Sequence, residues 1–280
     1  MHRIASLPGD EPQEEITFIE QPSAPVIFLT SATSDITCLS SALKLIENKT
    51  WEGKVRALPI SFLSSNAVID HYLSTTCANS KLIIIRFLGT KSSWSYGFEQ
   101  IKLWQLSNPS RHLIVVSGTY ENTIELNEIS DLELNEVNYI QSILNQGGSN
   151  NYTLFLNQLN NILSSNNIIV DNSKIENFDD IIKWRWKESN STSVGIILYK
   201  SLLQAGDTDF AESIINISEK YNLNPKVIWI TSLKSQNVQK EIIYLFKKEN
   251  IEAIITTTSF ATLEYSNKDI TNQLWDQLCI

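Results

Sequence analysis

The sequence lacks a long hydrophobic run, and this absence argues against a membrane-spanning helix. Hydrophobic residues make up 42% of the 280 residues, but no stretch approaches the roughly 18 consecutive apolar residues that a helical span requires. The opening segment turns acidic at Asp10, too soon for a secretory signal peptide. We therefore expect a soluble cytoplasmic protein, long enough to bury one large core or two ordinary ones.

Cysteines and basic clusters are also scarce. The three cysteines, Cys38, Cys77 and Cys279, are far apart and show no CxxC spacing, so the sequence indicates neither a zinc site nor a disulfide framework. The net charge is −9, with 31 acidic and 22 basic residues, and the basic residues do not cluster. Because phosphate binding needs clustered lysine and arginine, we expect no nucleic-acid partner.

Short apolar segments bounded by turn residues recur in the first part of the chain. They predict buried parallel strands at Val26–Leu29, Val55–Leu58, Leu82–Ile85 and Leu113–Val116. Ser34 or Asp35 is expected to begin a helix after the first strand, and Ser64 or Ser65 to begin one after the second. Strands that alternate with helices in this way predict βαβ units and an open parallel sheet.

The last part of the chain repeats this alternation. It predicts strands at 194–199, 226–230 and 253–257, and helices at 208–221 and 235–248. The expected apolar stripes are Phe210, Ile214, Ile217 and Tyr221 on the first helix, and Val238, Ile242 and Leu245 on the second.

The middle of the chain has a weaker pattern, with helix-like pieces on either side of Gly147 and Gly148, which force a reversal. We therefore expect an α/β fold with two open parallel-sheet units. A flavodoxin-like or periplasmic-binding-like unit at 1–117 is followed by a helical or irregular connector at 118–193 and a second unit at 194–280. Three strands and two crossover helices form only half of a doubly wound domain, so we expect the second unit to be incomplete at its C-terminal end.

One loop carries the residue types of a contact site. It runs from Arg86 through Trp94 and Tyr96 to Glu99, and it follows a predicted buried strand. Open α/β sheets place ligands at the carboxyl ends of their strands. The alternative is an ordinary strand-to-helix turn whose aromatic residues pack on the sheet.

A second aromatic pair, Trp184 and Trp186, flanks Arg185. Residues i and i+2 of a strand share a face, so we expect both indoles on one face of an edge strand or on a subunit contact.

Several ordered segments resemble one protein family. They are Met1–Gly9, Pro25–Ala32, the Arg86–Glu99 loop, Ile196–Thr208, Leu223–Pro225, Trp229–Lys234 and Thr256–Ala261. The last four are similar to the Tyr-Arg-Ser, Ala-Gly-Asn-Thr, Ser-Ser-Leu-Lys and Asn-Thr-Thr-Ala-Phe-Ala series in the large subunit of cobaltochelatase, the CobN type. Lys200, Asp207 and Thr256 depart from this series, because the family usually has Arg, Asn and Asn at these positions.

The resemblance implies ATP-dependent insertion of Co²⁺ into hydrogenobyrinic acid a,c-diamide, in aerobic cobalamin biosynthesis. The family's large subunit binds the macrocycle, and an AAA+ ATPase subunit with a companion subunit hydrolyses ATP. This chain agrees in lacking a Gly-x-x-x-x-Gly-Lys-Ser/Thr loop. The family's subunit is several times longer than 280 residues, so the chain is expected to be its amino-terminal fragment, inactive alone and with no metal or cofactor of its own.

Catalysis of metal insertion needs a base and a metal-holding group in one cavity. His2, His71 and His112 are poorly placed for these roles, and His71 and His112 are expected to have packing or surface roles. The catalytic residues are therefore expected beyond Ile280.

A corrinoid is a broad, partly apolar disc with carboxylates and amides at its rim, and its site needs aromatic faces and a few cations. If the resemblance holds, the candidate contacts in the first unit are Arg86, Trp94, Tyr96 and Glu99, and those at the equivalent edge of the second unit are Tyr199, Lys200, Gln204 and Thr208. The structural alternative pairs Arg86 with Glu99 and packs Trp94 into the core.

Two other functions remain open from the sequence. The first is a fragment of the magnesium chelatase large subunit, which takes protoporphyrin. The second is a non-catalytic tetrapyrrole-binding α/β module.

Overall fold

A computed structural model describes residues 17–46, 50–118, 124–164, 167–233 and 235–258, together with Leu274 and Leu278. Met1–Gly9, His2, Lys234, Cys279 and the segment from residue 259 to Ala261, on which some sequence predictions rest, lie outside these residues. Contacts divide the chain into two units, one of residues 1–32 and 49–138 and the other of residues 33–48 and 139–280. This division differs from the three segments expected from the sequence. The domain organisation in three segments stays a prediction.

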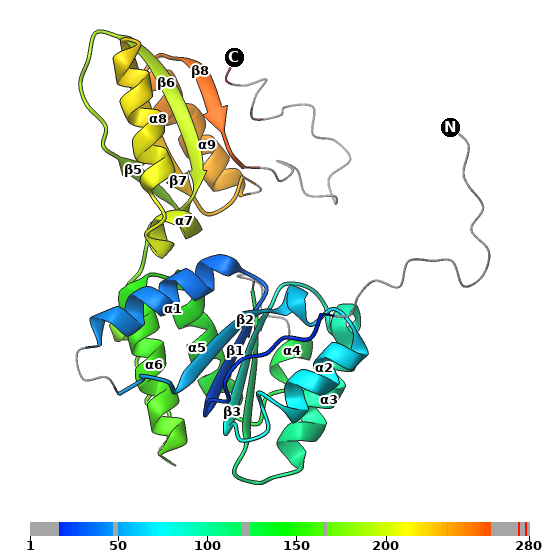
Figure 1. Ribbon diagram of the computed structural model, residues 1–280. Coiled ribbons are helices and arrows are strands. Elements are labelled where there is room, and N and C mark those ends of the chain that lie inside the picture. Colours follow the sequence, from blue (N-terminus) through cyan, green and yellow to red (C-terminus); the bar gives the residue numbers. More distant parts are fainter. Residues whose placement is uncertain are drawn as a thin grey trace, which may run out of the picture. The chain divides into compact units, whose positions relative to one another are not determined.

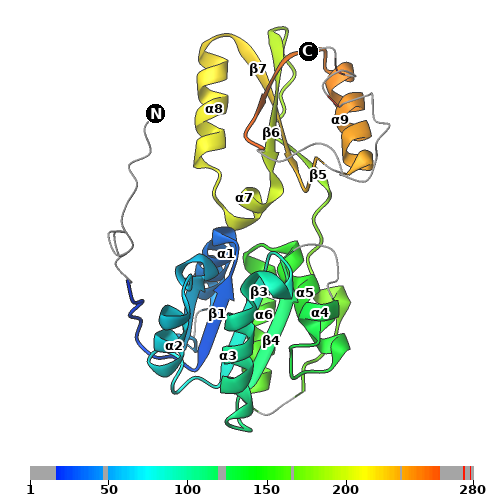
Figure 2. The same ribbon diagram turned by 90° about the vertical axis from the view of Figure 1, so that its right-hand side faces the viewer.

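The first unit contains a four-stranded, fully parallel sheet in the order β2-β1-β3-β4. Strands β1, β2 and β3 are labelled in Figure 1, and β4 in Figure 2. Its strands are β1 (Val26–Thr30), β2 (Val55–Pro59), β3 (Leu82–Phe87) and β4 (His112–Ser117). The four predicted strands are confirmed. This order matches the beginning of the flavodoxin-like order 2-1-3-4-5. In that order the second strand is added on one side of the first strand, and the later strands are added on the other side.

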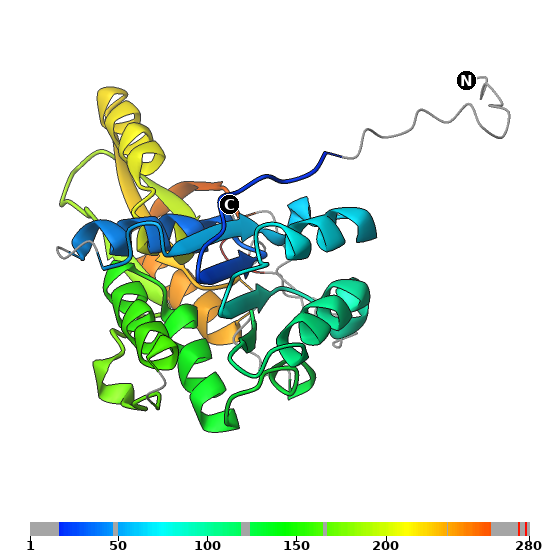
Figure 3. The same cartoon turned by 60° about the horizontal axis from the view of Figure 1, so that its bottom comes forward.

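Helices connect these strands and cover one face of the sheet. They are the short helices η1 (Ile60–Phe62) and η2 (Lys91–Trp94), and the helices α2 (Asn66–Ser74), α3 (Ser95–Leu106) and α4 (Ile124–Asn127). Helices α2 and α3 lie side by side (Figure 3). Ser65 caps α2 by accepting a hydrogen bond from the amide of Val68, at 3.4 Å, as the sequence predicts. Alternate strand residues such as Ile83 and Ile85 pack on these helices and form the first core.

The second unit contains a mixed sheet in the order β5-β7-β6-β8. Its strands are β5 (Ile181–Trp184), β6 (Thr192–Tyr199), β7 (Leu223–Ile230) and β8 (Ile251–Thr256). The three predicted strands are confirmed and pair in parallel. The sheet is thus mostly parallel, and β5, from the segment expected to be a connector, adds an antiparallel edge strand next to β7.

Helices α8 (Asp209–Lys220) and α9 (Gln236–Lys248) cover opposite faces of this sheet (Figure 2). Ser235 caps α9 by accepting from the amide of Val238 at 3.4 Å. The predicted stripe on α9 is buried. The stripe on α8 is only partly confirmed. Phe210 and Ile214 pack against the core beside buried Ala211, Ile215 and Ser218, but Ile217 and Tyr221 are 58% and 72% exposed.

The remaining helices of the second unit are α1 (Thr33–Leu45), α6 (Ser149–Leu163), η3 (Asn172–Lys174) and α7 (Lys200–Ala205). Helix α5 (Leu134–Gln146) spans the boundary between the units. Gly147 and Gly148, with φ of 64° and 82°, separate α5 from α6 as predicted. Helix α1 packs against α6 and α7, and the hydroxyl of Tyr152 donates to the buried carboxylate of Asp35 at 2.8 Å.

The tryptophans of the Trp184–Trp186 segment lie on opposite faces of the sheet, so the expectation of one shared face is wrong. Trp184 packs with the α8 core, and Trp186 packs with the α9 core. Arg185 has a left-handed backbone, with φ of 55°, which breaks the alternation of an extended strand. The edge position of β5 is confirmed.

A buried ion pair holds the edge segment to the sheet. The ammonium of Lys226 on β7 lies 2.9 Å from the carboxylate of Glu249 and donates to the carbonyl of Lys187 at 2.7 Å. The Lys226 side chain is 3% exposed and that of Glu249 is 21% exposed. The indole of Trp186 lies over the same ammonium, at 5.3 Å, and donates to the carbonyl of Val227 at 2.6 Å. Lys226 therefore joins β7, α9 and the chain after β5.

We predict that Glu249→Gln lowers the free energy of unfolding by about 2 kcal/mol, because it leaves a buried ammonium without its counter-charge. Urea denaturation followed by circular dichroism measures the change. The double variant Lys226→Met/Glu249→Leu removes both charges and should lose less than Glu249→Gln alone. Glu241→Gln, at an exposed position of α9, is the control. Equal stability of Glu249→Gln and Glu241→Gln would contradict this role.

Candidate functional site

The eight candidate contact residues fall into two groups, and each group lies in one unit. Arg86, Trp94, Tyr96 and Glu99 belong to the first unit, and Tyr199, Lys200, Gln204 and Thr208 belong to the second. Both groups lie at or just after the carboxyl end of a parallel strand.

In the first unit, the carboxyl ends of the three strands β1, β3 and β4 are joined by hydrogen bonds. The amide of Ser31 donates to the carbonyl of Arg86 at 3.0 Å, and the amide of Leu88 donates to the hydroxyl of Ser31 at 3.0 Å. The amide of Gly118 donates to the carbonyl of Phe87 at 2.7 Å. Because β1 lies between β2 and β3, the sheet's topological switch point lies beside this edge, where α/β folds bind ligands. Half-buried Arg86 stands there, in register with Thr30 of β1.

The indole of Trp94 packs on the first core, as the structural alternative expects. It stacks on Phe87, with ring centroids 6.0 Å apart, and meets Phe98 edge-on at 5.3 Å. Its Nε1 donates to the carbonyl of Leu63 at 3.2 Å. A Cβ atom at Gly97 would lie 2.2 Å from this indole, so the glycine leaves the room that the ring occupies.

Tyr96 and Glu99 lie on α3, where the half-buried ring of Tyr96 packs against the first core. The hydroxyl of Tyr96 lies 2.9 Å from both carboxylate oxygens of Asp70 on α2. This hydrogen bond to a carboxylate raises the pKa of Tyr96 above its usual value. Glu99 is exposed, and its expected ion pair with Arg86 stays a prediction.

In the second unit, Tyr199 ends β6 and Lys200 begins α7. Lys200 is 3% exposed, and its ammonium donates to the carbonyls of Phe178 at 3.3 Å and Asp179 at 3.2 Å. Burial lowers the pKa of Lys200, and the neighbouring carboxylates of Asp180 and Asp179 oppose that shift. Lys200 therefore ties the end of β6 to the chain that precedes β5.

Gln204 and Thr208 complete the second group. The side-chain amide of Gln204 donates to the carbonyl of Gln146, and its backbone carbonyl accepts from the thiol of Cys38 at 3.6 Å. Half-buried Thr208 precedes α8, and its carbonyl accepts from the amide of Glu212 at 3.0 Å. The sequence did not predict these structural contacts of Lys200 and Gln204, because their partners lie far away along the chain.

His71 and His112 both contact other side chains. The imidazole of His112 lies 2.9 Å from the carboxylate of Asp131, and the ring of His71 lies 4.6 Å from that of Phe18. Among the described residues, no three His, Cys, Asp or Glu side chains gather as metal ligands. The helices in the described part of the chain are too short or too polar to cross a membrane.

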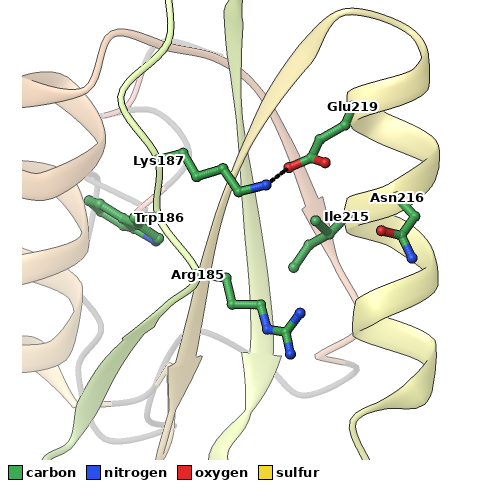
Figure 4. A pocket seen from close by; sticks show the side chains of 6 residues that line it. All are labelled: Arg185, Trp186, Lys187, Ile215, Asn216 and Glu219. Carbon is green, nitrogen blue, oxygen red and sulfur yellow. Dashed lines mark hydrogen bonds and ion pairs between the residues drawn. The ribbon is translucent and has the colours of Figure 1, made fainter.

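A pocket that the sequence did not predict lies in the second unit, between α8 and the chain after β5 (Figure 4). It has a volume of about 380 Å³ and is lined by Arg185, Trp186, Lys187, Ile215, Asn216 and Glu219. A signal was present in the sequence, since Lys183, Arg185 and Lys187 recur at every second position.

We predict that Trp94→Ala lowers the free energy of unfolding by about 2 kcal/mol, because it opens a cavity against Phe87 and Phe98. Trp94→Phe should lose less, since a ring remains. Thermal or urea denaturation measures both. Unchanged stability of Trp94→Ala together with lost tetrapyrrole binding would instead assign the indole to ligand contact.

A second prediction concerns pH. A lysine whose pKa is lower in the folded than in the unfolded state binds fewer protons when folded, so stability rises with pH between the two pKa values. We expect the free energy of unfolding to rise as the pH approaches 10.5, the ordinary pKa of lysine, and expect Lys200→Met to lose this part of the rise. Urea denaturation from pH 7 to the alkaline limit measures the difference, and identical pH profiles would contradict it.

Comparisons with known proteins agree with this architecture. The chain is 24% identical over 278 residues to the aerobic cobaltochelatase subunit CobN of Pseudomonas aeruginosa, covering 93% of this chain and 22% of that protein. It is 20% identical over 265 residues to the subunit of the same name from Sinorhizobium sp, covering 86% of this chain and 20% of the relative. The chain therefore spans about a fifth of the length of these relatives.

A solved structure shares the fold. The catalytic subunit of cobaltochelatase from Mycobacterium tuberculosis superposes with a TM-score of 0.53 and 17% sequence identity, over 85% of this chain and 18% of that one. The family model of CobN/Magnesium Chelatase matches residues 138–279, which is just over half of the chain. This chain therefore belongs to the CobN/magnesium chelatase family.

Proposed function

We propose that this chain is the amino-terminal part of the tetrapyrrole-binding large subunit of a cobaltochelatase. The observation that carries the proposal is family membership over residues 138–279, with relatives that are named cobaltochelatase subunits. In this proposal the whole enzyme inserts Co²⁺, as a substrate, into hydrogenobyrinic acid a,c-diamide with the help of ATP. ATP is hydrolysed by a partner AAA+ ATPase subunit with its companion, and the enzyme works in the cytoplasm.

The role that we propose for this chain within the enzyme is to hold the macrocycle. The carboxyl ends of the parallel strands support this role, because open α/β sheets bind ligands there. Arg86 stands beside a topological switch point of the first sheet, and a guanidinium suits the rim carboxylates of a corrinoid. Tyr199 stands at the equivalent place in the second sheet, where β6 lies between β7 and β8.

We propose different roles for the eight candidate residues. Trp94, Lys200 and Gln204 have structural contacts that explain them without a ligand. We propose Arg86, Tyr96, Glu99, Tyr199 and Thr208 as direct contacts of the macrocycle. The base and metal-holding groups of the reaction are proposed to lie beyond Ile280.

The proposal predicts that the chain binds metal-free hydrogenobyrinic acid a,c-diamide more tightly than protoporphyrin in absorbance titrations. Tighter binding of protoporphyrin would favour a magnesium chelatase subunit, and no binding of either would contradict a macrocycle-holding role for this chain.

A matched pair of variants tests the proposed edge. Arg86→Gln should weaken corrinoid binding about tenfold, the effect of one lost charge-assisted pair. Arg56→Gln, at a half-buried arginine near the beginning of β2, should leave binding unchanged. Circular dichroism verifies that both variants fold, and equal affinities of the two variants would contradict the placement of the site.

A further inference from the structure

The pocket between α8 and residues 185–187 lies far along the sheet from the proposed tetrapyrrole edge. Strand β5 runs antiparallel to β7 and pairs Trp184 with Val227. The chain after Trp184 therefore continues beside the beginning of β7, at the amino-terminal end of the parallel strands. Tyr199, Lys200 and Thr208 lie at the carboxyl-terminal end. Binding of a ligand in this pocket is therefore independent of the proposed tetrapyrrole binding.

Two cations point from this segment toward α8 (Figure 4). The guanidinium of Arg185 meets the carboxylate of Glu212 through two contacts, of 2.6 Å and 2.5 Å. The ammonium of Lys187 lies 2.6 Å from the carboxylate of Glu219. Glu212 and Glu219 are two helical turns apart, on the same side of α8. The pocket is thus bordered by two ion pairs, and buried Ile215 also lines it.

The backbone beneath these cations is held in place from the other face of the sheet. The indole of Trp186 donates to the carbonyl of Val227, and the ammonium of Lys226 donates to the carbonyl of Lys187. The guanidinium of Arg185 also lies over the ring of Trp184, at 4.9 Å. Arg185 keeps its left-handed backbone, a conformation that persists only where the surroundings impose it. The backbone that carries the two cations is therefore held in place.

The two ion pairs are easily exchanged, because their cations are open to solvent. The side chains of Arg185 and Lys187 are 55% and 64% exposed. Exposed ion pairs contribute little to stability, because water and salt screen them. A carboxylate from a ligand that enters the pocket can replace a glutamate carboxylate at little cost, and the two-contact geometry of Glu212 on Arg185 is the geometry that such a ligand would adopt.

We propose that this pocket binds a small dicarboxylate, with one carboxylate on Arg185 and the other on Lys187. Arg185 and Lys187 are two residues apart and carry long, exposed side chains, so their cations can reach the two carboxylates of one short acid. The volume of about 380 Å³ exceeds that of roughly ten water molecules, enough for such an acid. Glu212 and Glu219 occupy the cations in the free protein and compete with the ligand.

This competition predicts that removing a cation weakens ligand binding and that removing a glutamate carboxylate strengthens it. A purely structural role of the ion pairs does not predict these opposite effects. The probe is glutarate, titrated calorimetrically into the 280-residue chain at constant ionic strength, with acetate as the monocarboxylate reference. We expect glutarate to bind more tightly than acetate. Arg185→Gln and Lys187→Gln should each weaken glutarate binding about tenfold, and Glu212→Gln and Glu219→Gln should each tighten it about threefold.

Lys248→Gln and Glu241→Gln are the controls, because they make the same charge changes at exposed positions of α9, on the opposite face of the sheet. Both should bind glutarate as the unaltered chain does. Thermal denaturation of every variant verifies folding. No preference for glutarate over acetate, or a weakening in both the cation and the glutamate variants, would overturn the proposal.

Discussion

The structure depends on the burial of parallel strands on both faces. Strand β3 has four consecutive fully buried residues, Leu82–Ile85, and the central strand β6 of the second sheet is buried from Val194 to Leu198. A parallel strand cannot turn back directly to its neighbour, so each pair needs a crossover connection. These crossovers provide the helices that cover the sheets, and they bring the carboxyl ends of neighbouring strands to one edge. The same constraint that forms the cores therefore also forms the proposed ligand edges.

Three parallel strands follow the same order in both sheets. In the first, β1 lies between β2 and β3, and in the second, β6 lies between β7 and β8. Each central strand therefore ends beside a topological switch point. The second sheet adds an antiparallel edge strand, β5, which is held through Trp186 and the buried ammonium of Lys226. That addition creates the pocket at the opposite end of the sheet and gives this unit two chemically different ends.

The sequence predicts the elements that depend on local pattern and misses those that depend on distant partners. The seven strands found by their apolar runs and the caps at Ser65 and Ser235 follow from local chemistry. The pairing of β5 could not be predicted, because its partner β7 lies far away along the chain. The face of α8 was misjudged in part because Ala211 and Ser218, which are small, fit the sheet more closely than Ile217 and Tyr221. Likewise, nothing near Lys200 in the sequence indicates that carbonyls of Phe178 and Asp179 hold its ammonium.

The central proposal is that this chain contacts the macrocycle through residues at the carboxyl ends of its parallel strands. Amide hydrogen exchange of the chain, measured by mass spectrometry with and without hydrogenobyrinic acid a,c-diamide, tests it most directly. The account predicts slower exchange of the backbone at 88–96 and 199–208 when the ligand is bound, and unchanged exchange in α9. Slower exchange confined to other segments, or no change at all, would contradict the claim.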